Sequence, residues 1–220
     1  MIRAVAWIPL ARSRMALCSD QLLKVLVIGD VRVGKTSIVL RYVKKSFIEN
    51  YKTTIGVDFA LKTLQWEPRT VIRLQFWDIA GQEQTRAMSR VFFKEARGAL
   101  VVFDASDWST LESAAQWKRD LDSKVTRDSG QPIPALLLAN KCDLMERIDR
   151  ERMAPSLDEF CKDNYFTGWF ETSAKEDLNI EEAASFLVDQ MMSQGQDDFK
   201  MKDVIKPEEK TGQSVTALCC

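Results

Sequence analysis

The sequence predicts a doubly wound α/β fold, a mostly parallel six-stranded sheet with helices on both faces. The near-continuous apolar runs Gly98–Asp104 and Ala135–Asn140 are typical of parallel strands that are buried on both faces. Segments with helical periodicity alternate with the apolar runs along the chain, as they do in the βαβ units of parallel sheets. The glycine-containing stretch Gly29–Ser37 joins a third apolar run to a helical pattern.

The remaining strands and helices can be placed in chain order. A first strand is expected over Leu22–Ile28 and a helix over Ser37–Lys45. Between Asp58 and Asp78 two strand-like runs flank Glu67-Pro68-Arg69, a turn signal that predicts a hairpin. The last strand is expected within Phe166–Glu171. A final helix should follow, because one helical face carries Ile180, Ala183, Ala184, Leu187, Val188 and Met191.

Both ends of the chain differ from the middle. Periodicity fades from Gln194, so we expect a folded domain over residues 21–194 and a flexible tail over 195–220. Residues 1–20 interleave arginines with apolar residues and carry no acid before Asp20, a composition shared with mitochondrial transit peptides and, more weakly, with signal peptides. The interpretation we favour is a disordered leader, or an upstream start before Met15.

Composition excludes some classes of function. With 45% hydrophobic and 29% charged residues the chain is typical of soluble globular proteins, and a net charge of −1 gives no indication of nucleic-acid binding. It has no histidine, which excludes histidine acid–base catalysis and histidine metal ligands. The five cysteines are irregularly spaced, which favours a reducing compartment. No apolar run approaches the ~20 residues that span a bilayer.

The first chemical motif is Gly29-x-x-x-x-Gly34-Lys35-Thr36, which follows one strand and opens a helix. In that context backbone N–H groups cradle phosphate oxygens, Lys35 reaches the outer phosphates and the Thr36 hydroxyl can ligate Mg²⁺. The amides expected to contribute are those of Val31, Arg32, Val33, Gly34, Lys35, Thr36 and Ser37. Val31 and Arg32 are bulky, and their side chains can crowd the space near a γ-phosphate.

The second motif, WDIAGQE at Trp77–Glu83, ends a strand. Asp78 is placed to hold Mg²⁺, through a water. Gly81 lets its backbone N–H approach a terminal phosphate, and Gln82 can orient an attacking water as the catalytic residue.

Two further motifs point to the base of a nucleotide. In NKCD at Asn140–Asp143, the Asp143 carboxylate can only accept hydrogen bonds, so it suits the ring N–H and amine of guanine rather than adenine. The Lys141 stem can lie over the base, and Asn140 can tie this loop to the phosphate loop. In TSAK, the amides of Ser173, Ala174 and Lys175 can support the guanine carbonyl, although a helix cap at Thr172 or Ser173 explains that motif equally well.

In this order the four motifs resemble those of the Ras superfamily of small GTPases, and within it the Rab family. The similarity runs from about Leu22 to Met192 and includes the Rab-like IGVDF at Ile55–Phe59. Isoleucine within WDIAGQE, together with LLANKCDL and GWFETSAKE, resembles the Rab branch of lysosome-related organelles and trans-Golgi–endolysosomal traffic. The resemblance implies the G-domain fold of P-loop small GTPases.

The resemblance also implies roles for residues outside the motifs. Thr54 would reach Mg²⁺ and the γ-phosphate in the GTP state, Phe47 would pack beside guanine and Tyr51 would close over the phosphates. Effectors would contact Ile55, Phe59, Trp77 and Phe92, although aromatic residues are as often part of a core. Cys219 and Cys220 match a double geranylgeranylation site, and two lipid chains give stable membrane anchoring.

The implied function is a GTP/GDP-regulated switch in vesicle trafficking, with Mg²⁺ as cofactor, that hydrolyses GTP slowly without an activating protein and recruits effectors when GTP-bound. Its partners would be an exchange factor, an activating protein, effectors and a prenyl-binding escort or dissociation inhibitor. The protein would be a monomer on the cytoplasmic face of trans-Golgi, endolysosomal or lysosome-related membranes, cycling with the cytosol.

Two alternatives remain open at this point. One is a slowly hydrolysing GTP-binding interaction module that is mostly GTP-bound. The other is an ATPase or small-molecule kinase, which Asp143 disfavours. The chain also departs from the usual Rab pattern after GQE, where Gln84-Thr85 replaces Arg-Phe and Ala87 stands at or beside a hydroxyl that a kinase phosphorylates in this branch.

Overall fold

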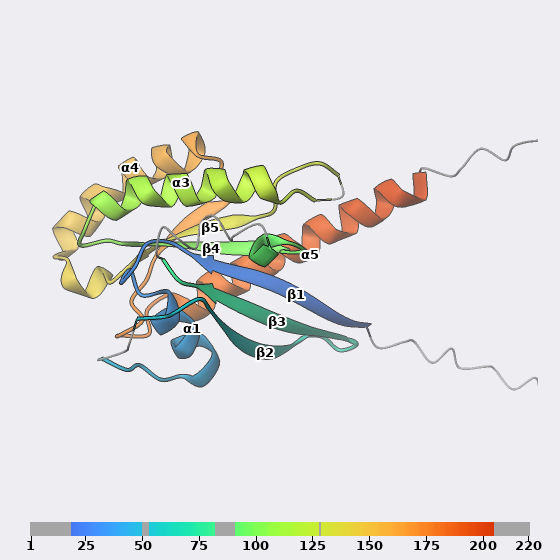
Figure 1. Ribbon diagram of the computed structural model, residues 1–220, viewed down its shortest axis with the longest axis horizontal. Helices are drawn as coiled ribbons and strands as arrows, with labels where there is room; N and C mark the ends of the chain where they lie inside the picture. Colours follow the sequence, from blue (N-terminus) through green and yellow to red (C-terminus); the bar gives the residue numbers. More distant parts are fainter. Residues whose placement is uncertain (1–18, 50–52, 82–90, 128, 205–220) are drawn as a thin grey trace, which may run out of the picture.

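The structure is a computed structural model that describes residues 19–49, 53–81, 91–127 and 129–204, with side chains up to 194. Six strands form one sheet in the order β2-β3-β1-β4-β5-β6 (Figure 1). Their bounds are β1 Ser19–Ile28, β2 Val57–Glu67, β3 Thr70–Ile79, β4 Gly98–Asp104, β5 Ala135–Asn140 and β6 Gly168–Glu171. The helices are α1 Lys35–Lys44, α3 Ser109–Lys124, the 3₁₀ turn η1 Cys142–Leu144, α4 Arg147–Asp163 and α5 Ile180–Val204.

The sheet is parallel except at one edge. β2 and β3 form the antiparallel hairpin expected between Asp58 and Asp78, whereas β1 pairs in parallel with both β3 and β4. The chain therefore proceeds in opposite directions from β1, first toward β3 and β2 and later toward β4, β5 and β6. In open α/β sheets a ligand binds at such a switch point, outside the carboxyl ends of the strands.

Each face of the sheet has its own hydrophobic core. Helices α3 and α4 pack on one face, where Trp117 and Leu157 are fully buried, and α1 and α5 pack on the other (Figure 1). Strand β4 contributes to both, because Val101 faces the first core and Val102 the second. Burial on both faces explains why β4 and β5 are apolar without alternation.

The predicted fold class is confirmed, but element bounds differ from expectation, most of all at the two ends of the domain. β1 begins at Ser19, which pairs with Thr70, so residues 19 and 20 belong to the sheet rather than to the leader. α5 continues past Gln194 to Val204. Apolar periodicity reports which helical residues are buried, so it fades where the helix leaves the core although the helix continues. Within the described residues, no helix is both long and apolar enough to cross a membrane.

Candidate functional site

A cleft of about 520 Å³ opens at the carboxyl ends of the strands, at the expected switch point. Its walls come from the loops that follow β1, β3, β5 and β6, together with the segment after α1. It is lined by Val31, Arg32, Gly34, Lys35, Thr36, Ser37, Phe47, Ile48, Glu49, Thr53, Thr54, Gly81, Asn140, Lys141, Asp143, Leu144, Ala174 and Lys175. Most of the residues expected to bind the nucleotide are thus brought to one cavity.

Close packing makes glycine necessary in the loop after β1. A Cβ on Gly29, whose φ is +141°, would lie 2.1 Å from the carbonyl oxygen of Val102. One on Gly34, with φ +99°, would lie 2.2 Å from the Asn140 amide nitrogen. That nitrogen donates to the carbonyl of Val33 at 2.8 Å, so Asn140 ties the loop after β5 to the loop after β1. Val33 is buried and is not part of the cleft lining, although its backbone carbonyl accepts this hydrogen bond.

Lys35 is a buried cation at the floor of the cleft. Its side chain is 6% exposed, and Nζ donates to the Asp30 carbonyl at 2.6 Å. Burial lowers the Lys35 pKa to about 8, against the opposing charges of Asp78 and Asp30. A bound polyphosphate would supply the negative charge that favours the ammonium form.

Three side-chain oxygens from separate elements converge beside Lys35. The hydroxyl oxygens of Thr36 and Thr54 lie 2.7 Å apart, and the Thr36 hydroxyl donates to Oδ2 of Asp78. Burial raises the Asp78 pKa, while the Thr36 hydrogen bond and the Lys35 charge oppose that shift. Oδ1 of Asp78 is buried with no hydrogen-bond partner within the part of the chain that is described. Hard oxygen donors and an unsatisfied carboxylate oxygen suit Mg²⁺.

The other end of the cleft is built around Asp143. Its Oδ1 accepts a hydrogen bond from the Ser173 hydroxyl at 2.5 Å, and Ser173 is fully buried. Arg41 donates to the carbonyls of Ala174 and Lys175 at 2.8 and 2.9 Å, which pins the loop after β6. Ser173 therefore lies behind the cleft wall, where its side chain orients Asp143.

Lys141 is held by a residue to which sequence reasoning assigned no role. Its backbone is left-handed, with φ 63°, and its Nζ forms an ion pair with Asp104 at 2.5 Å. Asp104 ends β4 and also accepts hydrogen bonds from the amide and hydroxyl of Ser106. The position of Asp104 at a strand's carboxyl end was the signal that could have identified it. The cleft residues Ile48, Glu49, Thr53 and Leu144 were also missed, although each lies within two positions of a predicted one.

Gly81 packs directly on the loop after β1. A Cβ there would lie 2.3 Å from the carbonyl carbon of Asp30 and the amide nitrogen of Val31, so only glycine fits. Several predicted positions lie outside the described residues: Tyr51, Gln82, Gln84, Thr85, Ala87, Cys219 and Cys220.

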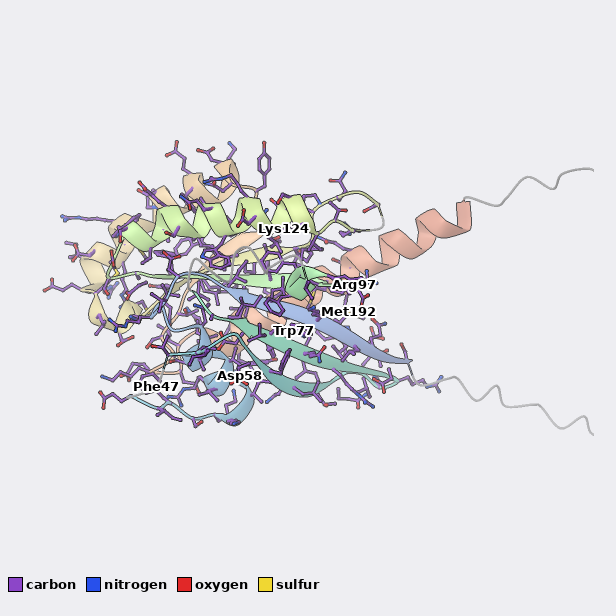
Figure 2. The ribbon with its side chains drawn as sticks, viewed as in Figure 1. Phe47, Asp58, Trp77, Arg97, Lys124 and Met192 are labelled. Atoms are coloured by element: carbon purple, nitrogen blue, oxygen red, sulfur yellow. The ribbon has the colours of Figure 1, made fainter. Side chains whose placement is uncertain are left out.

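The residues expected to contact effectors differ in exposure. Ile55 is 91% exposed and Phe59 is 56% exposed. The rings of Phe59 and Trp77 meet edge to face with centroids 4.5 Å apart, and Nζ of Lys24 lies 3.5 Å from the Trp77 ring centroid. Trp77 and Phe92 are half-buried against the core. Figure 2 shows Trp77 well away from Phe47, which lies at the cleft.

Comparison with known proteins decides the family. Residues 24–193, most of the chain, match the model of the Ras family. The chain belongs to the Ras family. This GTPase is 57% identical to mouse Ras-related protein Rab-32 over 177 residues, which are 80% of the chain and 78% of the relative. It is 55% identical to Rab-32A of Dictyostelium discoideum over 175 residues, 79% and 80% of the two chains. Human Ras-related protein Rab-7L1 is 49% identical over 181 residues, which are 82% of this chain and 87% of the relative.

These findings confirm the resemblance to Rab small GTPases. The Ras-family protein is a GTP hydrolase of vesicle trafficking and binds guanine nucleotide. The alternative of an ATPase or small-molecule kinase is thereby set aside. As a Rab GTPase it works in membrane-associated traffic with regulators and effectors.

Proposed function

We propose that this Rab GTPase is a Mg²⁺-dependent switch in which Thr54 distinguishes bound GTP from bound GDP. The observation that carries the proposal is the convergence of Thr54, Thr36 and Asp78 next to Lys35 in the cleft. When bound there, Mg²⁺ would neutralise charge on the β- and γ-phosphates. Thr36 and Asp78 would hold the metal in both nucleotide states, and Thr54 would join them with GTP, which orders its loop.

The protein's own residues divide the remaining work. Lys35 and the amides of the loop after β1 hold the phosphates, and Gly81 brings its backbone N–H close to that loop. Asp143, oriented by Ser173, selects guanine, and the Lys141 stem covers the base with its amine held by Asp104. We assign Gln82 the orientation of the attacking water.

Single-turnover hydrolysis of GTP pre-bound to the full chain tests this proposal. We expect GTP to be cleaved over minutes to hours, and we expect Asp143→Asn to lose its preference for guanine. An Asp163→Asn variant, at the exposed last residue of α4, serves as a surface control. Retention of guanine preference by Asp143→Asn would contradict the assignment.

The second candidate, a slowly hydrolysing module that stays GTP-bound, is favoured by one observation. Val31, 42% exposed, and Arg32 both line the cleft beside Gly34 and Lys35. We infer that their bulk crowds the space near a bound γ-phosphate. GTP that remains in the purified protein after hours at 25 °C would favour this candidate over the cycling switch.

Membrane attachment and partners extend the proposal. Geranylgeranyl chains on Cys219 and Cys220 would anchor the protein to the cytoplasmic face of trans-Golgi, endolysosomal or lysosome-related membranes. A prenyl-binding escort or dissociation inhibitor would return it to the cytosol, and effectors would contact Ile55, Phe59, Trp77 and Phe92. Mass spectrometry of the C-terminal peptide tests the lipids, and fractionation of a Cys219→Ser/Cys220→Ser variant tests the anchoring.

The leader is tested separately. We propose that residues before β1 are a dispensable leader and that residues 205–220 act as a tail for the lipids. Chains that start at Met1 and at Met15 should localise identically. Mitochondrial import of the longer chain alone would overturn this.

A further inference from the structure

A second groove lies beside the nucleotide cleft. It has a volume of about 530 Å³ and lies between the connection from β4 to α3 and the segment from η1 into α4. Figure 1 shows that α3 and α4 begin at the same end of the molecule, where this groove opens. It is lined by Ala105, Ser106, Trp108, Leu144, Met145, Glu146, Asp149, Arg152, Met153 and Ser156.

The groove has an aromatic and apolar wall. The Trp108 side chain is 44% exposed although it also packs on Phe103, with ring centroids 6.5 Å apart. Leu144 is 63% exposed, and Met153 is buried and closes the floor. Large exposed apolar side chains beside a concave surface are a feature of interaction sites.

The same groove carries carboxylates that have no partner. Within the described part of the chain, the side chains of Glu146 and Asp149 form no hydrogen bond or ion pair, and both are exposed. Their neighbours on α4 differ, because Arg147 pairs with Glu151 and Arg150 pairs with Glu171. Arg147 and Arg150 are therefore engaged elsewhere, and Arg152 is the one cation, among the residues described, that lines the groove with the two carboxylates.

We propose that this groove binds one arginine side chain of a partner protein, next to an apolar residue in the partner. An indole face attracts a cation, and a planar guanidinium can stack on it while its N–H fork reaches carboxylates. Trp108 supplies the face, Glu146 and Asp149 supply the carboxylates, and Leu144 contacts the apolar neighbour. With Arg152 on the same rim, the groove carries two negative charges and one positive charge, so one arginine neutralises it and a second cation is repelled.

Occupation of the groove should change guanine-nucleotide affinity. Leu144 lines both cavities, belongs to the same 3₁₀ turn as Asp143, and its amide donates to the Lys141 carbonyl at 3.0 Å. Ser106 also lines the groove, and it donates to Asp104, which holds Lys141. A partner in the groove therefore contacts Leu144 and Ser106, which both connect to Lys141 in the loop after β5. A partner that changes nucleotide affinity must have its own affinity changed by the nucleotide to the same extent. The coupling rests on the proposed roles of Asp143 and Lys141, whereas docking of the arginine does not.

The docking is tested by NMR on the full chain loaded with GDP and Mg²⁺. The probe is N-acetyl-leucyl-arginine amide, and its matched control carries citrulline, which is similar in shape but uncharged. We expect saturable shifts of the Trp108 indole N–H and the Leu144 methyls. Affinity should be at least about five-fold weaker for citrulline, which loses both the cation–π contact and the charge pairing with Glu146 and Asp149. Glu146→Gln with Asp149→Asn should weaken arginine binding similarly. Glu159→Gln, at an exposed position of the same helix outside the groove, should not.

Three results would overturn the docking. The first is the absence of a saturable shift, and the second is equal affinity of the chain for the arginine and citrulline peptides. The third is equal affinity of the arginine peptide for the wild-type chain and for the variant without the two carboxylates. Shifts at Trp108 that depend on protein concentration would assign the groove to a second copy of the chain instead. Release of N-methylanthraniloyl-GDP measures the coupling, and a release rate unchanged by saturating peptide would overturn the coupling alone. Retention of guanine preference by Asp143→Asn would refute the proposed role of Asp143 and leave the NMR result standing.

Discussion

The hydroxyl oxygens of Thr36 and Thr54 lie 2.7 Å apart, although the two residues are 18 positions apart in the chain. Thr36 is fixed by helix α1, whereas Thr54 lies in the irregular segment between α1 and β2. Both hydroxyls also contact Asp78, so the segment that carries Thr54 meets helix α1 and strand β3 at the proposed metal site. A loop held by such a contact can respond to what occupies the cleft.

Thr54→Ala tests that relationship. We expect Mg²⁺-dependent affinity for a non-hydrolysable GTP analogue to fall about ten-fold, because one oxygen ligand is lost, and affinity for GDP to change little. Isothermal titration at saturating and at chelated Mg²⁺ measures both. Thr53→Ala, which alters the neighbouring cleft residue, is the matched control. An equal loss for both nucleotides would mean that Thr54 does not distinguish the two states.

Asp143→Asn should change which base the protein binds. Guanine presents two donors to the carboxylate, whereas the side-chain amide introduced by this substitution can donate to the C2 carbonyl of xanthine. We therefore expect preference to shift toward xanthosine nucleotides by a factor of about 10² or more. Ser173→Ala should cost guanine nucleotides only about five- to ten-fold, because it removes the Ser173 hydrogen bond that orients Asp143. Competition binding with GDP and XDP measures both variants. Equal losses for the two substitutions would place the selectivity elsewhere.

The fold was predictable because its strongest signals are local. Buried strands such as Gly98–Asp104 and Ala135–Asn140 are continuous in sequence, and the order of strands and helices follows from their alternation. The site motifs were also predictable, since backbone cradles need glycine at fixed spacing. Asp104 escaped prediction because its role depends on Lys141, a contact between residues 37 positions apart. The second groove was not predicted for the same reason, because it lies between residues 105–108 and 144–156, which no sequence motif connects.

Lys35 predicts a pH dependence of the nucleotide-free protein. Burial lowers its pKa in the folded state to about 8 from 10.5, so the unfolded chain binds more protons between those two values. The free energy of unfolding should therefore rise between pH 8 and 10.5, and the shift corresponds to at most roughly 3 kcal/mol. Urea titrations of the nucleotide-free protein at pH 7.5 and 10 give the difference. Lys35→Met should lack this rise, and Lys44→Met, at the exposed end of α1, should retain it.

Arg32→Gly should change both stability and turnover. Arg32 adopts a left-handed backbone, φ 65°, at the wall of the cleft. Release of that strain gains about 1–2 kcal/mol, while the added freedom of glycine in the unfolded chain costs about 0.4–1 kcal/mol, so a net gain of about 1 kcal/mol is expected. Because the side chain crowds the proposed reaction space, single-turnover hydrolysis should also accelerate. Arg69→Gly, in the turn between β2 and β3, controls for loss of charge. A more stable variant with unchanged hydrolysis would show that Arg32 strains the loop without obstructing the reaction.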